Sequence, residues 1–212
     1  MGTRNLTMVI DPKGVTKVAQ YGQWDGYPSG VGSTILDFLK AVVLVEFIQK
    51  LESVQCDTQE QRNEFLKSIG LVEGKPATKK QEELYNERYF FDNRDIAGDI
   101  LTNIMECQDE QIVLVNSEDF ASDSVFCEWA YVIDLQKMTF EVYEGFNKSP
   151  LDEGERFFHL QEEAIKENSS RKDSGLSSEY FPVRLVKEYN LTELPEKEEF
   201  VKECEPKDEE EE

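Results

Sequence analysis

The stretch VAQYGQWDGYPSGVGS, residues 18–33, combines side chains that could contact a ligand with a backbone that could approach one closely. Its four glycines suit neither a core strand nor an ordinary turn, whereas three aromatic rings could stack on a base or a sugar. Amide and carboxylate side chains beside the rings could hydrogen-bond the edges of such a ligand. The alternative is a rigid turn whose aromatic side chains seal one end of the core, and the sequence leaves both interpretations open.

The same stretch leads directly into an apolar helical pattern, which Ser33 or Thr34 can cap. Free backbone amides and the helix dipole at such a start attract phosphate or carboxylate groups. No lysine follows, and the glycine spacing is neither that of a P-loop nor that of GxGxxG. We therefore predict that the amides from Gly30 to Thr34 bind an anion.

Two arginines could add positive charge to this site, because cations are scarce in the chain and a guanidinium can clamp an anion. Arg94 stands beside an expected helix start, and Arg4 heads the first expected strand. The candidate ligand-binding residues are Arg4, Gln20, Tyr21, Gln23, Trp24, Asp25, Tyr27, Ser29, Gly30, Gly32, Ser33, Thr34 and Arg94.

Other reactive side chains do not form a recognisable motif, so we predict no catalytic residue, no cofactor and no metal site. His159 is the only histidine, and no sequence feature brings it near a cysteine. The four cysteines (Cys56, Cys107, Cys127 and Cys204) are scattered without a CxxC pair, which indicates free thiols in a reducing compartment. No secretory signal or bilayer-length apolar run is present, so we expect a cytoplasmic protein without membrane contact.

The charge of the chain is strongly acidic, with a formal net value of −22 over 212 residues. Such a charge repels nucleic acid and anionic membranes, so we expect no direct binding to either. The acidic surface either keeps the protein soluble or imitates nucleic acid toward a basic partner protein. The acids concentrate at the C-terminal end, and we predict one domain over residues 1–194 followed by an acidic disordered tail over 195–212.

Hydrophobic periodicity predicts an α+β fold, in which a mostly antiparallel sheet of five to six strands is built from hairpins and carries packed helices. Residues 168–178 are rich in serine and charge, and we expect them to be mobile. The expected elements are a hairpin at 5–21, a long helix at 34–51, surface helices at 59–69 and 79–89, a helix starting at Asp92 or Asn93, a strand at 111–116, a hairpin at 126–143, a helix at 155–166 and a strand at 180–188.

The opening MGTRNLTMVI followed by KVAQYGQWDGYPSG resembles that of an uncharacterised protein family of bacteria and their phages. Two shorter segments, at 93–98 and within 129–143, agree with it, and together these pieces cover about a third of the chain. A weaker similarity is to N-terminal-nucleophile hydrolases, which also begin with a strand hairpin. Those enzymes attack with Cys, Ser or Thr as residue one, whereas removal of Met1 here leaves Gly2, and Thr3 would require a further cleavage.

These observations favour a phage-associated cytoplasmic binding protein that holds a small anionic, nucleotide-like molecule at residues 21–34. The phage context implies capture of a host signalling nucleotide and thus an action against host defence. One alternative is an acidic inhibitor that occupies the nucleic-acid-binding surface of a host protein. The other is an amide hydrolase with a processed N-terminus.

Overall fold

The computed structural model describes residues 2–72, 74–166 and 179–205. The predictions made for residues 168–178 and for the last seven residues lie outside this part of the chain. Among the residues that the structure describes, no helix is both long and apolar enough to cross a bilayer.

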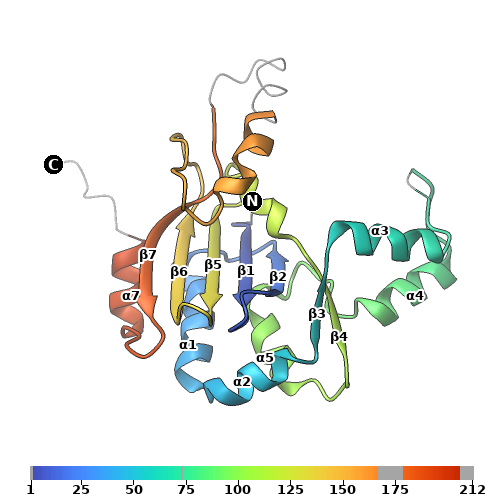
Figure 1. Cartoon of the computed structure of the whole chain (residues 1–212), viewed down its shortest axis with the longest axis horizontal. Helices are drawn as coiled ribbons and strands as arrows, with labels where there is room; N and C mark the ends of the chain where they lie inside the picture. Colours follow the sequence, from blue (N-terminus) through green and yellow to red (C-terminus); the bar gives the residue numbers. More distant parts are fainter. Residues whose placement is uncertain (1, 73, 167–178, 206–212) are drawn as a thin grey trace.

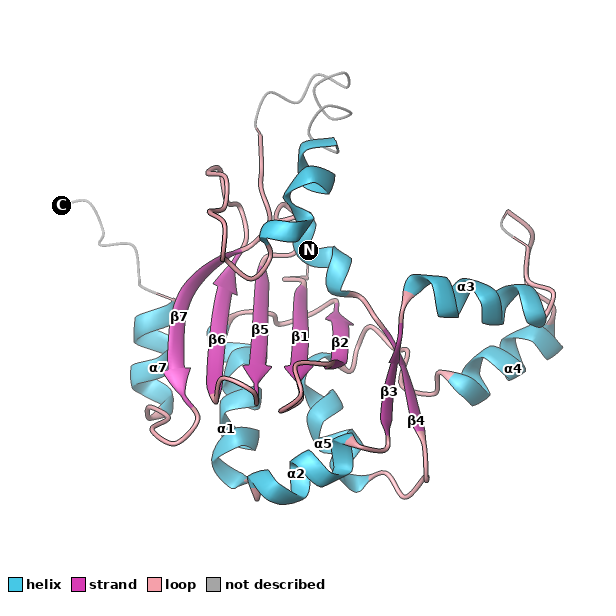
Figure 2. Ribbon diagram, in the orientation of Figure 1, coloured by secondary structure: helices cyan, strands magenta, loops and turns pink. Residues whose placement is uncertain are grey.

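A five-stranded mixed sheet forms the centre of the molecule, with strand order β2-β1-β5-β6-β7 (Figures 1 and 2). Neighbouring strands are antiparallel except β1 and β5, which pair in parallel. The predicted α+β class with a mostly antiparallel sheet is therefore confirmed. The strands are β1 (Asn5–Ile10), β2 (Thr16–Gly22), β5 (Trp129–Asp134), β6 (Thr139–Glu144) and β7 (Arg184–Asn190).

Alternate residues of the central strands point to opposite sides of the sheet. Because both sets are apolar, each face of the sheet is covered by other parts of the chain. Val9, Tyr131 and Ile133 belong to a core shared with helices on one side, and Leu6 and Val132 belong to a second core on the other. That second face is covered by apolar side chains from loops and turns outside the sheet, including Ala121, Leu151, Phe157, Leu160 and Val183. The helices of the first core are α1 (Ser33–Ala41), α2 (Leu44–Leu51), α5 (Ile100–Glu106) and α7 (Lys197–Cys204).

A helical arm extends from one side of this body (Figure 1). Its base is a two-stranded parallel sheet of β3 (Val54–Asp57) and β4 (Ile112–Val115), and its length is formed by α3 (Gln59–Ser68) and α4 (Lys79–Arg88). Capping boxes start both helices, which confirms the two predicted surface helices. The strand β3 was not expected from the sequence.

Three predicted helices differ in the structure. The helix expected at 34–51 is broken at the β-branched pair Val42 and Val43, where both residues are extended and the chain changes direction. The helix expected after Asp92 begins later, with a 3-10 turn η2 (Ala97–Asp99) before α5. The helix expected at 155–166 starts as a short 3-10 turn, Phe158–Leu160.

The prediction of a disordered tail beginning at residue 195 is wrong for its first part. Residues 197–204 form α7, and the Phe200 ring is fully buried beside Phe140 and Tyr189. The two apolar side chains Phe200 and Val201 within the acidic sequence bring this helix to the core. Its acids lie on the opposite, solvated side, as an amphipathic helix allows.

Candidate functional site

The stretch at residues 18–33 continues β2 into a loop, a π-helical turn η1 (Pro28–Gly32) and the start of α1. It contacts the segment before α5: the Gln23 amide donates to the Arg94 carbonyl at 2.9 Å, and the Gln20 side chain donates to the Asn93 carbonyl at 3.2 Å. Between the two segments lies a cleft of about 340 Å³. This Trp24 cleft is lined by Trp24, Asp25, Ser29, Gly30, Val31, Thr34, residues 95–99 and Lys197.

The glycines of the loop serve contacts inside the molecule. A Cβ on Gly30 would lie 2.3 Å from the Asp25 carbonyl oxygen, and one on Gly26 would lie 2.8 Å from that of Thr3. Gly32 lies against the buried ring of Tyr131, whose hydroxyl donates to the Gly26 carbonyl at 2.7 Å. The close approach expected from the sequence is therefore made to the chain itself, as in the rigid-turn interpretation.

The backbone amides predicted to bind an anion already have acceptors. Gly30 and Gly32 donate to the Tyr27 carbonyl at 2.9 and 3.2 Å, and Val31 donates to that of Asp25 at 2.8 Å. The Ser29 amide lies 3.3 Å from a Glu205 carboxylate oxygen. The expected anion-binding role of these amides is thus corrected, because the π-helical turn uses them internally and a carboxylate occupies its start.

The side chains of Ser33 and Thr34 also point back into this turn. The buried Ser33 hydroxyl donates to the Pro28 carbonyl at 2.9 Å, and Thr34 donates to that of Gly30 at 3.4 Å. Neither caps α1 in the expected way, since its N-cap position is Gly32. Both residues therefore stabilise the entry into α1, and only Thr34 lines the cleft.

The two candidate arginines lie apart. Arg4 sits at the start of β1, and its guanidinium carbon lies 4.6 Å from the centre of the Phe126 ring, away from the cleft lining. Arg94 is exposed, with Nε 3.8 Å from Asp95 Oδ1, and it lines a separate hollow with Tyr89. The fold therefore brings Arg94, but not Arg4, next to the candidate site.

The aromatic side chains divide into a packing group and an exposed group. Tyr21 is half-buried, donates to Gln23 Oε1 at 2.6 Å and packs edge-on against Phe120. Trp24 and Tyr27 are each 46% exposed, although rings of this size bury readily in a core. Trp24 packs over Gly2 and donates from Nε1 to Asp95 Oδ1 at 2.8 Å, so its exposed ring is held in one position.

Carboxylates dominate the polar lining of the Trp24 cleft. Asp25, Asp95 and Asp99 contribute negative charge, whereas Lys197 is the one cation of the lining and lies 3.0 Å from Asp37. The net charge of the lining therefore favours a cation beside the indole ring, whose face also attracts positive charge. This negative charge could not be predicted from the sequence, because the acids of the cleft come from two distant segments.

Two of the four non-glycine residues with positive φ in the described part of the chain lie in this cleft. Asp25 has φ +52° and Ala97 has φ +44°, and both line the cleft. Side-chain-bearing residues adopt this left-handed conformation rarely, and such residues often mark functional sites. The surrounding contacts impose this conformation: the Asp25 carbonyl accepts from Val31, and Ala97 lies against Gly22.

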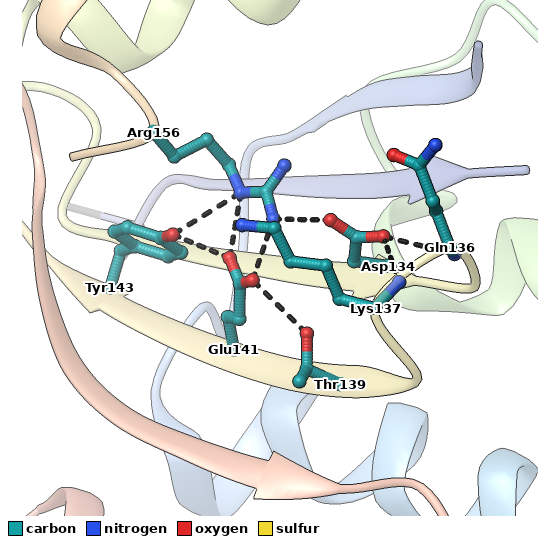
Figure 3. Close-up of polar contacts among 7 residues, drawn as sticks. All are labelled: Asp134, Gln136, Lys137, Thr139, Glu141, Tyr143 and Arg156. Carbon is teal, nitrogen blue, oxygen red and sulfur yellow. Dashed lines mark hydrogen bonds and ion pairs between the residues drawn. The ribbon is translucent and has the colours of Figure 1, made fainter. Parts of the chain in front are cut away.

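A second polar cluster lies on the other face of the sheet and was not expected from the sequence (Figure 3). Arg156 donates to Glu141 at 2.6 and 2.7 Å and to Asp134 at 2.7 Å, and all three side chains are buried or nearly so. Tyr143 donates to Glu141 at 2.5 Å. This cluster fixes the segment containing Arg156 to the β5–β6 hairpin.

Burial alone would raise the pKa values of Glu141 and Asp134. The hydrogen bonds from Arg156, with those from Tyr143 to Glu141 and from the Lys137 amide to Asp134, outweigh burial and lower the pKa of both carboxyl groups. Burial and the neighbouring Glu141 raise the pKa of Tyr143. Because every charged group here has a partner inside the cluster, its arrangement is that of a structural support.

The alternative nucleophiles are poorly placed for attack. Thr3 is 5% exposed, and its carbonyl accepts the Gly26 amide at 3.0 Å beneath the loop. Burial raises the pKa of the Cys56 thiol to about 12 and also raises that of Cys127, so neither thiol ionises near neutral pH. His159 is exposed, 3.4 Å from Glu118.

Within the described part of the chain, no group of three or more His, Cys, Asp or Glu side chains is placed to hold a metal ion. Comparison of the chain with models of protein families, with curated proteins and with solved structures finds no match.

Proposed function

We propose that this chain is a binding protein whose Trp24 cleft accepts a basic side chain of a partner protein. The observation that carries the proposal is the exposed Trp24 ring, held by Asp95 beside two further carboxylates, Asp25 and Asp99. An arginine or lysine side chain can place its apolar stem against the indole and its charge among the carboxylates. A clamped aromatic ring loses little side-chain entropy on binding.

This proposal is a specific form of the acidic protein–protein inhibitor, since it assigns the basic partner to a defined cleft. The formal net charge of −22 would speed the encounter with a basic partner. The alternative, a small nucleotide-like anion, has less support because the amides of Gly30, Val31 and Gly32 are occupied. Membership of the phage family and an action against host defence stay predictions from the resemblance.

The two tryptophans make the proposal testable by fluorescence. Trp24 is 46% exposed and Trp129 only 6%, so a ligand in the cleft changes chiefly the emission of Trp24. We would titrate the protein with an arginine- and lysine-rich hexapeptide, with its glutamate-substituted counterpart and with adenosine monophosphate. The expected result is a saturable response to the basic peptide alone.

Two variants test whether the basic peptide binds in the Trp24 cleft or is only attracted by the overall negative charge of the protein. Asp95→Asn should weaken binding of the basic peptide, whereas Glu83→Gln, which removes an exposed charge on α4 outside the cleft, should leave it unchanged. Equal weakening in both variants would indicate diffuse attraction and overturn the assignment. A saturable response to the nucleotide instead would restore the anionic-ligand function, with Arg94 as its nearest cation.

A further inference from the structure

The arm formed by α3 and α4 is a projecting element without a partner in the described structure. Neither helix contains a buried residue, and Figure 1 shows both extending away from the main sheet. Its base is nevertheless firmly held: Arg88 and Tyr89 donate to the buried Asp57 carboxylate at 2.7 and 2.9 Å, and Phe65 packs on Tyr89. An exposed helix pair on a fixed base has the form of a docking element.

The charge of the arm differs from that of the rest of the chain. Residues 58–88 contain six acidic and six basic residues, so the whole net charge of −22 resides elsewhere. Four lysines and one glutamate lie in the distal part, residues 66–80. Of the described residues there, Lys67, Lys75 and Lys80 are exposed and form no ion pair, so the end of the arm is basic.

This basic end also carries an apolar groove of about 690 Å³. Leu66, Leu71 and Val72 supply the apolar part of its lining, and Lys67 and Lys75 supply positive charge. Val72 is 53% exposed, which makes it one of the most exposed large apolar side chains of the described structure. Apolar side chains together with charged ones are found in protein–protein contacts, which combine an apolar core with a polar rim.

A complementary surface lies at the corner between α1 and α2. Val43 and Val45 are 57% and 63% exposed, the two highest values among the large apolar side chains of the described residues. Glu46 follows them, is exposed and forms no ion pair with any described residue. This corner, Val43–Glu46, is exposed, apolar and acidic, whereas the groove is apolar and basic.

We propose that the groove at the end of the arm binds the Val43–Glu46 corner of a second copy of this chain. The two valines of one copy would cover Leu66, Leu71 and Val72 of the other, and Glu46 would pair with Lys67 or Lys75. Because the two surfaces are different, the contact is head-to-tail and propagates into a ring or an open chain.

The arm also reduces the repulsion between two acidic bodies. A ten-residue helix such as α3 is about 15 Å long, which exceeds the Debye length of about 8 Å at physiological salt. Nucleic acid is disfavoured as the occupant, since the acidic body repels phosphate and the groove wall is apolar. A second copy supplies both the apolar and the acidic part of the contact.

The test is sedimentation velocity of the full chain over a range of concentrations, where we expect concentration-dependent assembly. Val43→Ser/Val45→Ser should give a monomer, and Lys67→Glu/Lys75→Glu should also give a monomer. Mixing these two variants should give a 1:1 dimer that grows no further, because each retains one intact surface. Val15→Ser, a control at a valine that is 52% exposed outside both surfaces, should assemble as the unaltered chain does.

A charge exchange provides a second measurement that loss of folding cannot imitate. Glu46→Lys should abolish assembly, and its combination with Lys67→Glu/Lys75→Glu should restore it. A monomeric unaltered chain at all concentrations, or assembly indifferent to both sets of variants, would overturn the proposal. Tight binding of a single-stranded oligonucleotide that is lost with Lys67→Glu/Lys75→Glu would reassign the groove to nucleic acid and also overturn it.

Discussion

The indole nitrogen of Trp24 donates a hydrogen bond to Oδ1 of Asp95 at 2.8 Å, and this bond joins residues 71 positions apart in the sequence. It connects the loop after β2 to the segment before α5, which form the two sides of the Trp24 cleft. An exposed tryptophan with a fixed orientation is therefore a product of two segments that meet only in the folded chain.

The hydrogen bond and the charge of Asp95 can be separated experimentally. Asp95→Asn keeps an oxygen that accepts from the indole but removes the negative charge, whereas Asp95→Ala removes both. We expect Asp95→Asn to weaken binding of a basic hexapeptide about fivefold, since an exposed charge pair contributes about 1 kcal/mol. In the absence of peptide, the fluorescence emission of Trp24 should be unchanged in Asp95→Asn, which keeps the hydrogen bond, and should shift in Asp95→Ala, which loses it. Equal affinities of Asp95→Asn and the unaltered chain would remove Asp95 from the binding site.

The loop conformation depends on the absence of a side chain at Gly30. Gly30→Ala would place a Cβ 2.3 Å from the Asp25 carbonyl oxygen, and the strained backbone of Asp25 cannot move away without losing its bond to Val31. We expect a loss of about 1–3 kcal/mol in the free energy of unfolding, measured by denaturant titration. Ser29→Ala, at the exposed neighbouring position, should change it by less than about 0.5 kcal/mol.

The buried cluster of Figure 3 should make stability depend on Arg156 and on pH. Arg156→Met leaves the carboxylates of Asp134 and Glu141 buried without their counter-charge, which should cost about 3–5 kcal/mol at pH 7. In the unaltered chain both carboxyl groups have lowered pKa values, so their contribution is present above the ordinary carboxyl pKa and lost as pH falls through the folded value.

The difference between Arg156→Met and the unaltered chain should therefore shrink between pH 7 and pH 4, because the variant's buried carboxyl groups accept protons readily. Thermal unfolding across this range measures the effect. The matched control is Arg184→Gln, which removes a half-exposed pair with Glu155 and should cost at most about 1 kcal/mol. A constant difference at all pH values would show that Arg156 acts by packing alone.

The helix α7 should be part of the cooperative fold. Phe200 is fully buried, with its ring centroid 5.8 Å from those of Phe140 and Tyr189. Phe200→Ala should lower the free energy of unfolding by about 3–5 kcal/mol, as for other fully buried aromatic residues. Lys202→Ala, on the exposed side of the same helix, should be nearly neutral in the same denaturant titration. A neutral Phe200→Ala would return this segment to the predicted tail.

Local patterns were sufficient to predict much of the secondary structure. Alternating residues predicted both hairpins, and the weak, polar pattern over residues 57–88 predicted two surface helices, which are α3 and α4. These signals work because strand alternation and helix periodicity depend on residues a few positions apart. The break at Val42 and Val43 was missed, because covering one sheet face with two helices is a tertiary requirement.

Residue patterns alone were enough to predict the α+β class, most of the elements and the importance of the stretch around Trp24. What that stretch can bind depends on how the chain folds around it, because a backbone amide is free or occupied according to the segment that packs beside it. The fold placed Asp95 and Asp99 opposite Asp25, directed Arg4 away and used the amides of η1 internally. Likewise, Arg156 pairs with Glu141, which lies 15 positions earlier in the sequence. The helix α7 places Phe200 and Cys204 in the core that lies between the sheet and the helices. Charge and hydrogen-bond complementarity between distant segments arise from packing, which local periodicity does not encode.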